Sequence, residues 1–402
     1  MQKKLLLLGG SRYLIPAIKA AHDLGAYVIT CDYLPDNYAH KLSDEYHNVS
    51  IIEKDAVLEL AQKLQIDGVM SYATDPGVAT AAYVAEKMGL PGNNPYESVA
   101  ILQNKGRFRA FLRDHGFNVP QMMTYKSWEA ILLDLKKIQY PVIVKPTDSA
   151  GSKGVTRVDC EADLQAAVQV ALDRSIGKEC IIEEFIEKKG FSTDTDSFSV
   201  DGNLVFFSLN DQWFDDNAAN IYTPAAYSWP STMPEQYQTE IKNEVQRLLK
   251  LLHMGTSIYN IETRIGSNGK AYIMEVSPRA GGNRLAEMLR YACGQDLIKT
   301  SVQGALGLPI DTLSQPVYQG YWGLAVLHSE QEGIYQGITF DKKLEDKIVE
   351  KDLWVQPGDK VEPFTGANES MGTLVLHCST HDELVQCLQN IKKLVSIKVV
   401  KA

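Results

Sequence analysis

Strand-sized apolar runs alternate with helical stretches over the first 95 residues, and this alternation most constrains the fold. The runs "KLLLLGG" (4–10) and "YVITCD" (27–32) are short and apolar, whereas "LIPAIKAAHDLG" (14–25) has the spacing and terminal glycine of a helix. Strands that are apolar at nearly every position are buried on both faces, and helical crossovers make neighbouring strands parallel. The pattern therefore predicts a parallel α/β sheet with helices on both faces.

The rest of the chain is too long to belong to the same core. A chain of 402 residues is expected to form several domains, here a parallel α/β domain, a helical linker, a compact α+β unit, a segment of hairpins and helices, and a C-terminal α+β module. Their expected ranges, in that order, are 1–95, 96–118, 119–186, 187–310 and 311–402. The acidic and aromatic stretch at 210–222 either lines a substrate pocket or is an ordinary loop.

Charge and cysteine content exclude several classes of protein. The formal net charge of −10 argues against broad binding to nucleic acid or to an anionic membrane surface, because both need a basic face. No apolar run approaches the roughly 20 residues of a membrane span. The six cysteines are scattered without a C-x-x-C spacing, so we expect a cytoplasmic protein with no disulfide framework.

Two weak motifs are each better explained by local structure. The glycines of "GGSRYL" do not complete the dinucleotide pattern G-x-G-x-x-G, so NAD binding is a weak alternative. Gly9, Gly10 and Asp75 follow strands at the edge where such sheets bind ligands, which makes them weak substrate-site candidates beside their turn and cap roles. In "HCSTH" (377–381) metal ligation is the weaker alternative, since Thr380 and Glu383 have the spacing of a capping box.

The stretch "VKPTDSAGSKGV" (144–155) combines a loop of small residues with two lysines. Lys145 ends an apolar strand, and Lys153 lies between Gly151 and Gly154. Small residues let backbone N–H groups approach an anion closely, and the lysines add positive charge, so a polyphosphate is the natural ligand. The P-loop pattern G-x-x-x-x-G-K-[ST] is absent, and a surface turn with solvated lysines is the alternative.

A second informative stretch contains Asn268-Gly269 between two alternating segments. This dipeptide predicts a β-hairpin with a two-residue type I′ turn, in which Ser267 faces Lys270. Carried along both strands, the same register predicts the cross-strand pairs Glu262–Glu275 and Asn260–Ser277.

Two ionised glutamates directly across a strand pair repel each other. The repulsion is relieved if both are solvated, if one stays protonated, or if a cation lies between them. The oxygen-bearing side chains of Asn260 and Ser277 share the same face and favour a cation. Mg²⁺ held largely through nucleotide phosphates fits this set of ligands.

The order of these signals resembles the ATP-grasp superfamily. The resemblance consists of a lysine at 105, "VIVKP" (142–146), the Gly/Ser loop, "IIEEFI" (181–186) and the hairpin that ends in "EVSPR" (275–279), and it covers roughly residues 1–310. The tail resembles the C-terminal module of carboxylate–amine ligases such as L-amino acid ligase, biotin carboxylase-like and phosphoribosylglycinamide synthetase-like enzymes. This implies an ATP-grasp fold, in which 119–186 is the lid subdomain and 187–310 is the mixed-sheet core. It also implies an ADP-forming ligase that makes a C–N bond through an acyl phosphate.

The resemblance also implies roles for individual residues toward ATP and Mg²⁺, for which Mn²⁺ is a possible substitute. The implied ATP contacts, from the two strand- and helix-borne lysines, the lid loop and the hinge, are Lys105, Lys145, Ser149, Gly151, Ser152, Lys153, Gly154, Glu183, Glu184, Phe185, Ile186 and Glu187. The implied metal ligands are Glu262, Glu275 and Ser277, and the implied catalytic groups are Arg279 and Lys153. Ser277 stands where the family usually has Asn, and Gly190 stands where it often has an acidic ribose contact.

Several reactions remain open within and beyond this class. Ligation of two amino acids is the first expectation, and a purine-pathway reaction such as the joining of phosphoribosylamine to glycine is the second. A nucleotide-binding module without turnover is the alternative from another class. The expected partners are a small-molecule carboxylate and an amine, with a homodimer as a possible assembly.

Overall fold

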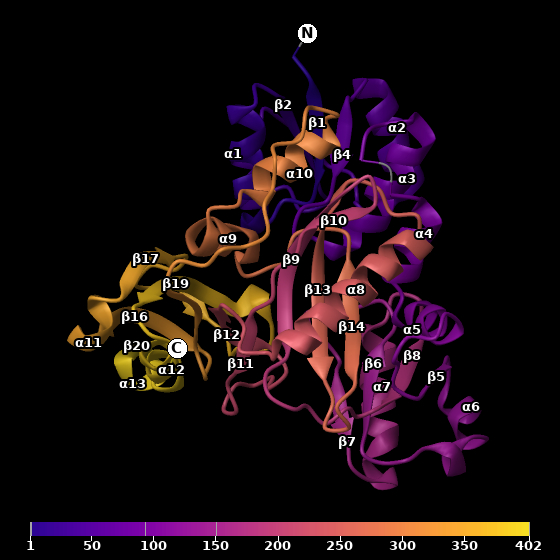
Figure 1. Ribbon diagram of the computed structural model, residues 1–402, viewed down its shortest axis with the longest axis vertical. Coiled ribbons are helices and arrows are strands. Elements are labelled where there is room, and N and C mark those ends of the chain that lie inside the picture. Colours follow the sequence, from indigo (N-terminus) through magenta and orange to yellow (C-terminus); the bar gives the residue numbers. More distant parts are fainter. Residues whose placement is uncertain (1, 93, 150, 402) are drawn as a thin grey trace.

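The computed structural model describes residues 2–92, 94–149 and 151–401 of the chain (Figure 1). The N-terminal unit lies at the top of Figure 1, a tall sheet fills the centre, a magenta unit lies at the lower right and the yellow C-terminal module at the lower left. Among the described residues no helix is long and apolar enough to cross a membrane.

The N-terminal unit is a four-stranded parallel sheet in the order β3-β2-β1-β4, as the strand–helix alternation predicts. Its strands are β1 (Lys4–Leu8), β2 (Tyr27–Cys31), β3 (Glu45–His47) and β4 (Gly68–Met70). Leu5 and Leu7 of β1 pack in one apolar cluster, and Leu6 and Leu8 pack in another on the opposite face. This alternation places α1 (Ile15–Asp23) on one face, and α2 (Lys54–Leu64) and α3 (Val78–Met88) on the other.

A helix from far along the chain completes the face that α1 covers. Helix α10 (Leu297–Ala305) packs against α1, and Ile298 and Val302 share a core cluster with Leu5 and Leu7. Gly68 allows the close approach, because a Cβ there would lie 2.2 Å from the carbonyl oxygen of Ala305. The N-terminal sheet and the central unit are therefore joined through one apolar core.

The lid subdomain is an antiparallel sheet in the order β5-β8-β6-β7 with two short helices. Its elements are β5 (Met122–Tyr125), α6 (Trp128–Leu132), β6 (Val142–Pro146), β7 (Thr156–Val158), α7 (Leu164–Arg174) and β8 (Cys180–Glu184). Helices α4 (Tyr96–Leu102) and α5 (Lys105–Asp114) connect it to the N-terminal unit. Val144 and Ile182 of adjacent strands share a core cluster with Leu164 and Val168 of α7.

The central sheet has the order β10-β9-β13-β14 and is antiparallel throughout. Its strands are β9 (Thr193–Val200), β10 (Asn203–Phe206), β13 (Ser257–Ile265) and β14 (Ala271–Ser277), and its covering helices are α8 (Glu235–Leu251) and α9 (Leu285–Cys293). Ile241, Val245 and Leu248 recur at helical spacing on α8 and pack in a core cluster with Ile261 and Val276.

The hairpin of β13 and β14 differs from the predicted turn but keeps the predicted pairs. Lys270 pairs with Gly266 rather than with Ser267, because the N–H of Gly266 donates to the carbonyl oxygen of Lys270 at 2.9 Å. The N–H of Gly269 donates to the carbonyl oxygen of Gly266 at 2.8 Å. Gly269 has a φ of +77° whereas Asn268 does not have a positive φ, so the type I′ turn is wrong, since that turn needs a positive φ at both central residues.

A β-bulge restores the register closer to the site. Thr263 pairs with Ile273 and Glu262 pairs with Glu275, which leaves Met274 as the extra residue of β14. The turn begins one residue early and the bulge adds one residue, so the two differences cancel. The predicted pairs Glu262–Glu275 and Asn260–Ser277 are both confirmed.

The C-terminal module contains two further sheets, in the orders β11-β12-β15-β19-β17 and β18-β16-β20. Their strands are β11 (Asp211–Phe214), β12 (Pro224–Trp229), β15 (Tyr321–His328), β16 (Gly333–Phe340), β17 (Ile348–Leu353), β18 (Lys360–Val361), β19 (Ser370–Cys378) and β20 (Val395–Val400). The helices are α11 (Lys342–Glu345), α12 (His381–Gln389) and α13 (Ile391–Leu394). One sheet takes strands from both sides of residue 310, and the domain boundaries stay a prediction.

Candidate active site

The centre of the site is a two-row array of polar side chains across β9, β13 and β14. Strand pairing aligns Asp194, Glu262 and Glu275 in one row, and it aligns Asp196, Asn260 and Ser277 in the next. The rows are two residues apart along each strand, so all six side chains share one face of the sheet.

Sequence reasoning missed the two aspartates of this array. The alternation in "TDTDS" (193–197) places Asp194 and Asp196 on one face of a strand, which is the available signal. Strand β9 pairs with its hairpin neighbour β10 and also with β13, which is more than 50 residues further along the chain. No local pattern in the sequence reveals the pairing with β13.

The Glu262–Glu275 pair has the excess of negative charge that is expected of a cation site. Burial first, and then the neighbouring Glu275 carboxylate, raises the pKa of Glu262. The Nζ of Lys105 lies 3.3 Å from Oε2 of Glu275, and Nη2 of Arg264 lies 3.9 Å from Oε1 of Glu262. The Lys105 ammonium thus offsets part of the negative charge that a metal cation would neutralise.

The donor set fits Mg²⁺ bound together with nucleotide phosphates. The glutamate side chains are 35% and 32% exposed, so each can turn toward a ligand in solvent. Among the described residues no group of three or more His, Cys, Asp or Glu side chains could hold a metal by itself. Mg²⁺ commonly takes one or two carboxylates and completes its shell with phosphate oxygens and water.

Ser277 and Arg279 are engaged with Asp75 of the N-terminal unit. Arg279 donates from Nε and Nη2 to the two oxygens of Asp75 at 2.8 and 2.7 Å, and Ser277 Oγ donates to Asp75 Oδ1 at 2.9 Å. Gln103 Nε2 also donates to Ser277 Oγ, at 2.9 Å. Burial acts to raise the pKa of Asp75, but the Arg279 guanidinium outweighs it and the pKa is lowered.

These contacts bear on the roles implied for both residues. The Ser277 hydroxyl already has a donor and an acceptor partner, and its place as a metal ligand remains a prediction. The donors of Arg279 are shared between Asp75 and the carbonyl oxygen of Ala280, so a contact with substrate also remains a prediction. What the structure brings together is the Asp75 loop and the end of β14.

Lys145 belongs to a buried ion cluster that the sequence did not reveal. Glu183 Oε2 accepts from Lys145 Nζ at 3.0 Å, and Glu183 Oε1 accepts from Arg109 Nε at 2.8 Å. Burial acts to raise the pKa of Glu183, but the Arg109 and Lys145 charges outweigh it and lower the pKa to about 2. Glu183 is 1% exposed, so its carboxylate positions Lys145 rather than facing solvent beside an adenine site.

The glycine loop is held against helix α5 and against the loop between β11 and β12. Gly151, Ser152 and Gly154 have φ values of +68°, +57° and +73°, a region that glycine adopts without strain. Ser152 Oγ donates to the carbonyl oxygen of Tyr222 at 3.1 Å, and Lys105 Nζ donates to the carbonyl oxygen of Ser149 at 2.9 Å. Lys153 is exposed, and Ala150, which the lid prediction spans, lies outside the described residues.

We expect the loop over 149–154 to exchange its backbone amides more slowly when nucleotide and Mg²⁺ are present. Few apolar side chains anchor it, and phosphates offer its N–H groups acceptors. Hydrogen exchange measured by mass spectrometry across 148–156, with and without an ATP analogue, tests this. Equal exchange in both states, judged beside α7 as an internal reference, would show a static turn.

The hinge residues at the end of β8 and just after it are fixed mainly through backbone atoms. Glu184 N–H donates to the carbonyl oxygen of Gln121 at 2.8 Å, and Arg264 Nη1 donates to the carbonyl oxygen of Ile186 at 3.3 Å. The Arg157 guanidinium lies 4.3 Å from the centroid of the Phe185 ring. The carbonyl oxygen of Glu187 accepts from Ser267 N–H at 2.7 Å, which ties the hinge to the hairpin turn.

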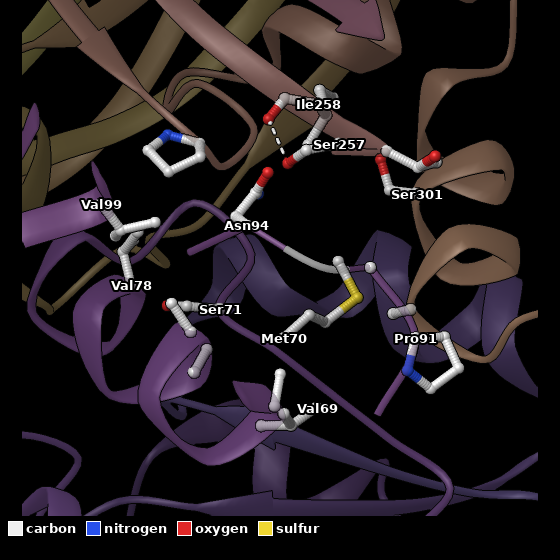
Figure 2. Close-up of a pocket in the computed structure, with 17 residues that line it drawn as sticks. Val69, Met70, Ser71, Val78, Pro91, Asn94, Val99, Ser257, Ile258 and Ser301 are labelled. Carbon is white, nitrogen blue, oxygen red and sulfur yellow. Dashed lines mark hydrogen bonds between the residues drawn. The ribbon is translucent and has the colours of Figure 1, made fainter. Parts of the chain in front are cut away.

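Figure 2 shows a separate, small pocket between the N-terminal unit and the central sheet. It has a volume of about 80 Å³, and its walls include Val69, Val78 and Val99 on one side and Ser257 and Ser301 on the other. None of the described residues that line it is charged. It therefore does not suit a polyphosphate, and the predicted ATP residues lie elsewhere.

The capping interpretation of "HCSTH" is confirmed. Thr380 Oγ1 accepts from the N–H of Glu383 at 3.2 Å at the start of α12, and Glu383 Oε2 accepts from the N–H of Ser379 at 3.0 Å.

Comparison with known proteins agrees with this arrangement of lysines, glycine loop and glutamate hairpin. Residues 138–287 match the family model of the ATP-grasp domain. The protein contains an ATP-grasp domain. The matched segment includes Lys145, the hinge and the Glu262–Glu275 pair, whereas Lys105 precedes it.

The proteins that match longer stretches of the chain are distant from it in sequence. The carbamoyl phosphate synthase large chain of Thermotoga petrophila is 27% identical over 226 residues, which are 56% of this chain and 20% of that protein. The chain thus spans about a fifth of the length of the carbamoyl phosphate synthases that it matches. The formate-dependent phosphoribosylglycinamide formyltransferase of Bacteroides thetaiotaomicron is 24% identical over 404 residues and covers 99% of each chain.

Solved structures show that the ATP-grasp fold extends through the whole chain. The L-amino acid ligase of Bacillus licheniformis superposes with a TM-score of 0.83 at 20% identity, and the match covers 100% of this chain and 99% of that one. The expected fold class, with its parallel-sheet unit, lid and C-terminal module, is thereby confirmed. The core differs in one respect, because its sheet is antiparallel throughout and not mixed.

Proposed function

We propose that the protein is an ADP-forming ligase that joins the carboxyl group of an amino acid-like substrate to an amine through an acyl phosphate. The observation that carries this proposal is the Glu262–Glu275 pair, which lies next to Lys105 and in the same row as Asp194 of β9. Binding of ATP without turnover scarcely requires paired carboxylates, so the pair argues against a module that only binds nucleotide.

The residues have complementary tasks in such a reaction. A substrate carboxylate oxygen attacks the γ-phosphorus and ADP leaves; the amine nitrogen then attacks the acyl carbon and phosphate leaves. Lys105, Lys145 and the N–H groups of the glycine loop are suited to hold the phosphates in line and to offset their charge. Mg²⁺ at Glu262 and Glu275 would neutralise the charge on the transferring group.

The charges around the site favour an amino acid over a phosphorylated substrate. Arg279 is bidentate to Asp75, and Arg284 makes ion pairs with Glu287 and Glu350. These guanidinium groups are therefore already compensated, whereas an anionic phosphoribosyl group needs uncompensated cations. The L-amino acid ligase of Bacillus licheniformis, which superposes on the whole chain, supports the same substrate class.

A purine-type reaction is the second candidate. Its support is the formate-dependent phosphoribosylglycinamide formyltransferase, which aligns with this chain over 99% of both proteins. Recognition of a ribose phosphate would then require Arg279 or Arg284 to exchange a carboxylate partner for the phosphate.

We expect ADP and phosphate to be released when ATP, Mg²⁺ and a suitable pair of amino acids are combined. A phosphate-release screen over amino acid pairs, with glycine plus phosphoribosylamine as a separate arm, measures this, and mass spectrometry identifies the nucleotide product. AMP and pyrophosphate would exclude an acyl phosphate. Release only in the phosphoribosylamine arm would favour the purine-type reaction.

A further inference from the structure

A hydrogen-bonded acidic network lies beside the proposed metal carboxylates. Asn260 Nδ2 donates to Oδ1 of Asp194 at 2.6 Å and to Oδ1 of Asp196 at 3.4 Å. Gly281 N–H also donates to Asp196 Oδ1, at 2.8 Å. A side chain at position 281 would force the network to shift, because a Cβ there would lie 2.7 Å from Asn260 Nδ2 and 3.0 Å from Asp196 Oδ1.

The network contains more acceptors than donors. Tyr227 O–H donates to Asp194 Oδ2 at 3.4 Å and accepts from Asn283 Nδ2 at 3.2 Å. Oδ2 of Asp196 and Oδ1 of Asn283 have no hydrogen-bond partner among the described residues, although the two side chains belong to residues only 0% and 5% exposed. Buried acceptors without donors are costly, so a fitting ligand supplies N–H donors and positive charge.

A primary ammonium group meets this requirement better than a second metal ion. An ammonium group carries three N–H donors on one compact charge, and one or two carboxylates suffice to bind it. A metal without phosphate ligands needs more protein ligands, and the part of the chain that the structure describes offers no group of three or more metal-binding side chains. Gly282, which follows Gly281 in the chain, has open space at its Cβ position, because a Cβ built there would meet no atom within 4 Å.

We propose that Asp194 and Asp196 bind the ammonium group of the acid substrate, which is therefore a zwitterionic amino acid. This inference rests on the proposed ligase function and specifies which substrate the site holds. Carboxylates stabilise the protonated amine, which has no free electron pair and cannot attack an acyl carbon. The bound amine thus belongs to the molecule whose carboxylate is phosphorylated, and the attacking amine comes from the second substrate.

The test compares amino acids with their des-amino analogues. Thermal-shift binding is measured with ADP and Mg²⁺ present, adding each standard L-amino acid or β-alanine singly and then the carboxylic acid that lacks its amino group. We expect at least one amino acid to bind and its analogue to bind at least tenfold more weakly. In Asp194→Asn and Asp196→Asn, affinity for that amino acid should fall about ten- to a hundredfold, with ATP affinity unchanged.

Each outcome separates the subsite from the ligase reaction. Asp173→Asn, an exposed aspartate on α7, is the matched control and should bind the amino acid as the wild type does. Equal binding of the des-amino acid, no effect of either variant, or a change only in Mg²⁺ dependence would overturn the subsite. Amino acid binding that depends on both aspartates, with no phosphate release from any substrate pair, would support the subsite while contradicting the ligase function.

Discussion

Glu275→Gln should lower turnover by about a hundred- to a thousandfold while the protein stays folded. The substitution removes one of two charges that face each other across β13 and β14, and with it half of the carboxylate charge available to Mg²⁺. Loss of one preorganised electrostatic contact to a transition state typically has an effect of this size. Phosphate release at saturating ATP and substrate measures it.

The same substitution should change stability little. Glu275 loses its ion pair with Lys105, a partly exposed pair worth about 0.2–1 kcal/mol, and the removal of repulsion from Glu262 offsets part of that loss. Glu240→Gln, an exposed change on α8, is the matched control and should retain full turnover. Wild-type rates in Glu275→Gln, or global unfolding, would contradict the metal assignment.

The Glu262–Glu275 pair was predicted from the Asn268-Gly269 turn signal, although the turn itself differs from the expected type I′ turn. The Asn268-Gly269 signal correctly located the hairpin, because the turn needs a residue with a positive φ and glycine adopts one easily. The turn itself begins at Gly266, and the bulge at Met274 restores the register before Glu262 is reached. Bulges depend on how a strand bends over its neighbours, and no local pattern marks this one.

The contacts that were missed all join segments distant in sequence. Asp194 meets Glu262 only because β9 pairs with β13, and Asp75 meets Arg279 only because the N-terminal unit packs beside the end of β14. Local periodicity predicts which face a residue occupies, but the neighbour across that face depends on sheet order. The pairs within the hairpin were therefore predictable from the sequence, whereas the partners that other strands and the N-terminal unit contribute were not.

Lys145 illustrates this difference most directly. Its place at the end of a strand before a glycine loop predicted a phosphate contact, and it lies in strand β6, where the apolar run predicted a strand. No pattern in the sequence indicated that Arg109, on helix α5, would meet the same buried carboxylate. If Lys145 binds a phosphate as proposed, its orientation by Glu183 would lower the side-chain entropy that it loses on binding.

Arg109→Met should destabilise the protein by about 3–5 kcal/mol, the largest stability effect that we expect from a single change at the site. The side chains of Arg109 and Glu183 are 1% and 0% exposed, so the Glu183 carboxylate would stay buried after the substitution. Lys145 would then be its one charged partner among the described residues. Urea unfolding measures the loss. Arg113→Met, an exposed arginine on the same helix, should change stability by about 0.5 kcal/mol or less.

The double variant Arg109→Met with Glu183→Met distinguishes a buried charge from a simple loss of packing. When both charges are removed, no carboxylate is left buried at this position, and Lys145 can turn its ammonium toward solvent because its side chain is 15% exposed. The double variant should therefore be more stable than Arg109→Met alone, since apolar replacement of a whole buried pair is often nearly neutral. If the stability losses of the two single variants simply add in the double variant, Arg109 acts through packing. The orientation of Lys145 by Glu183 then does not depend on Arg109.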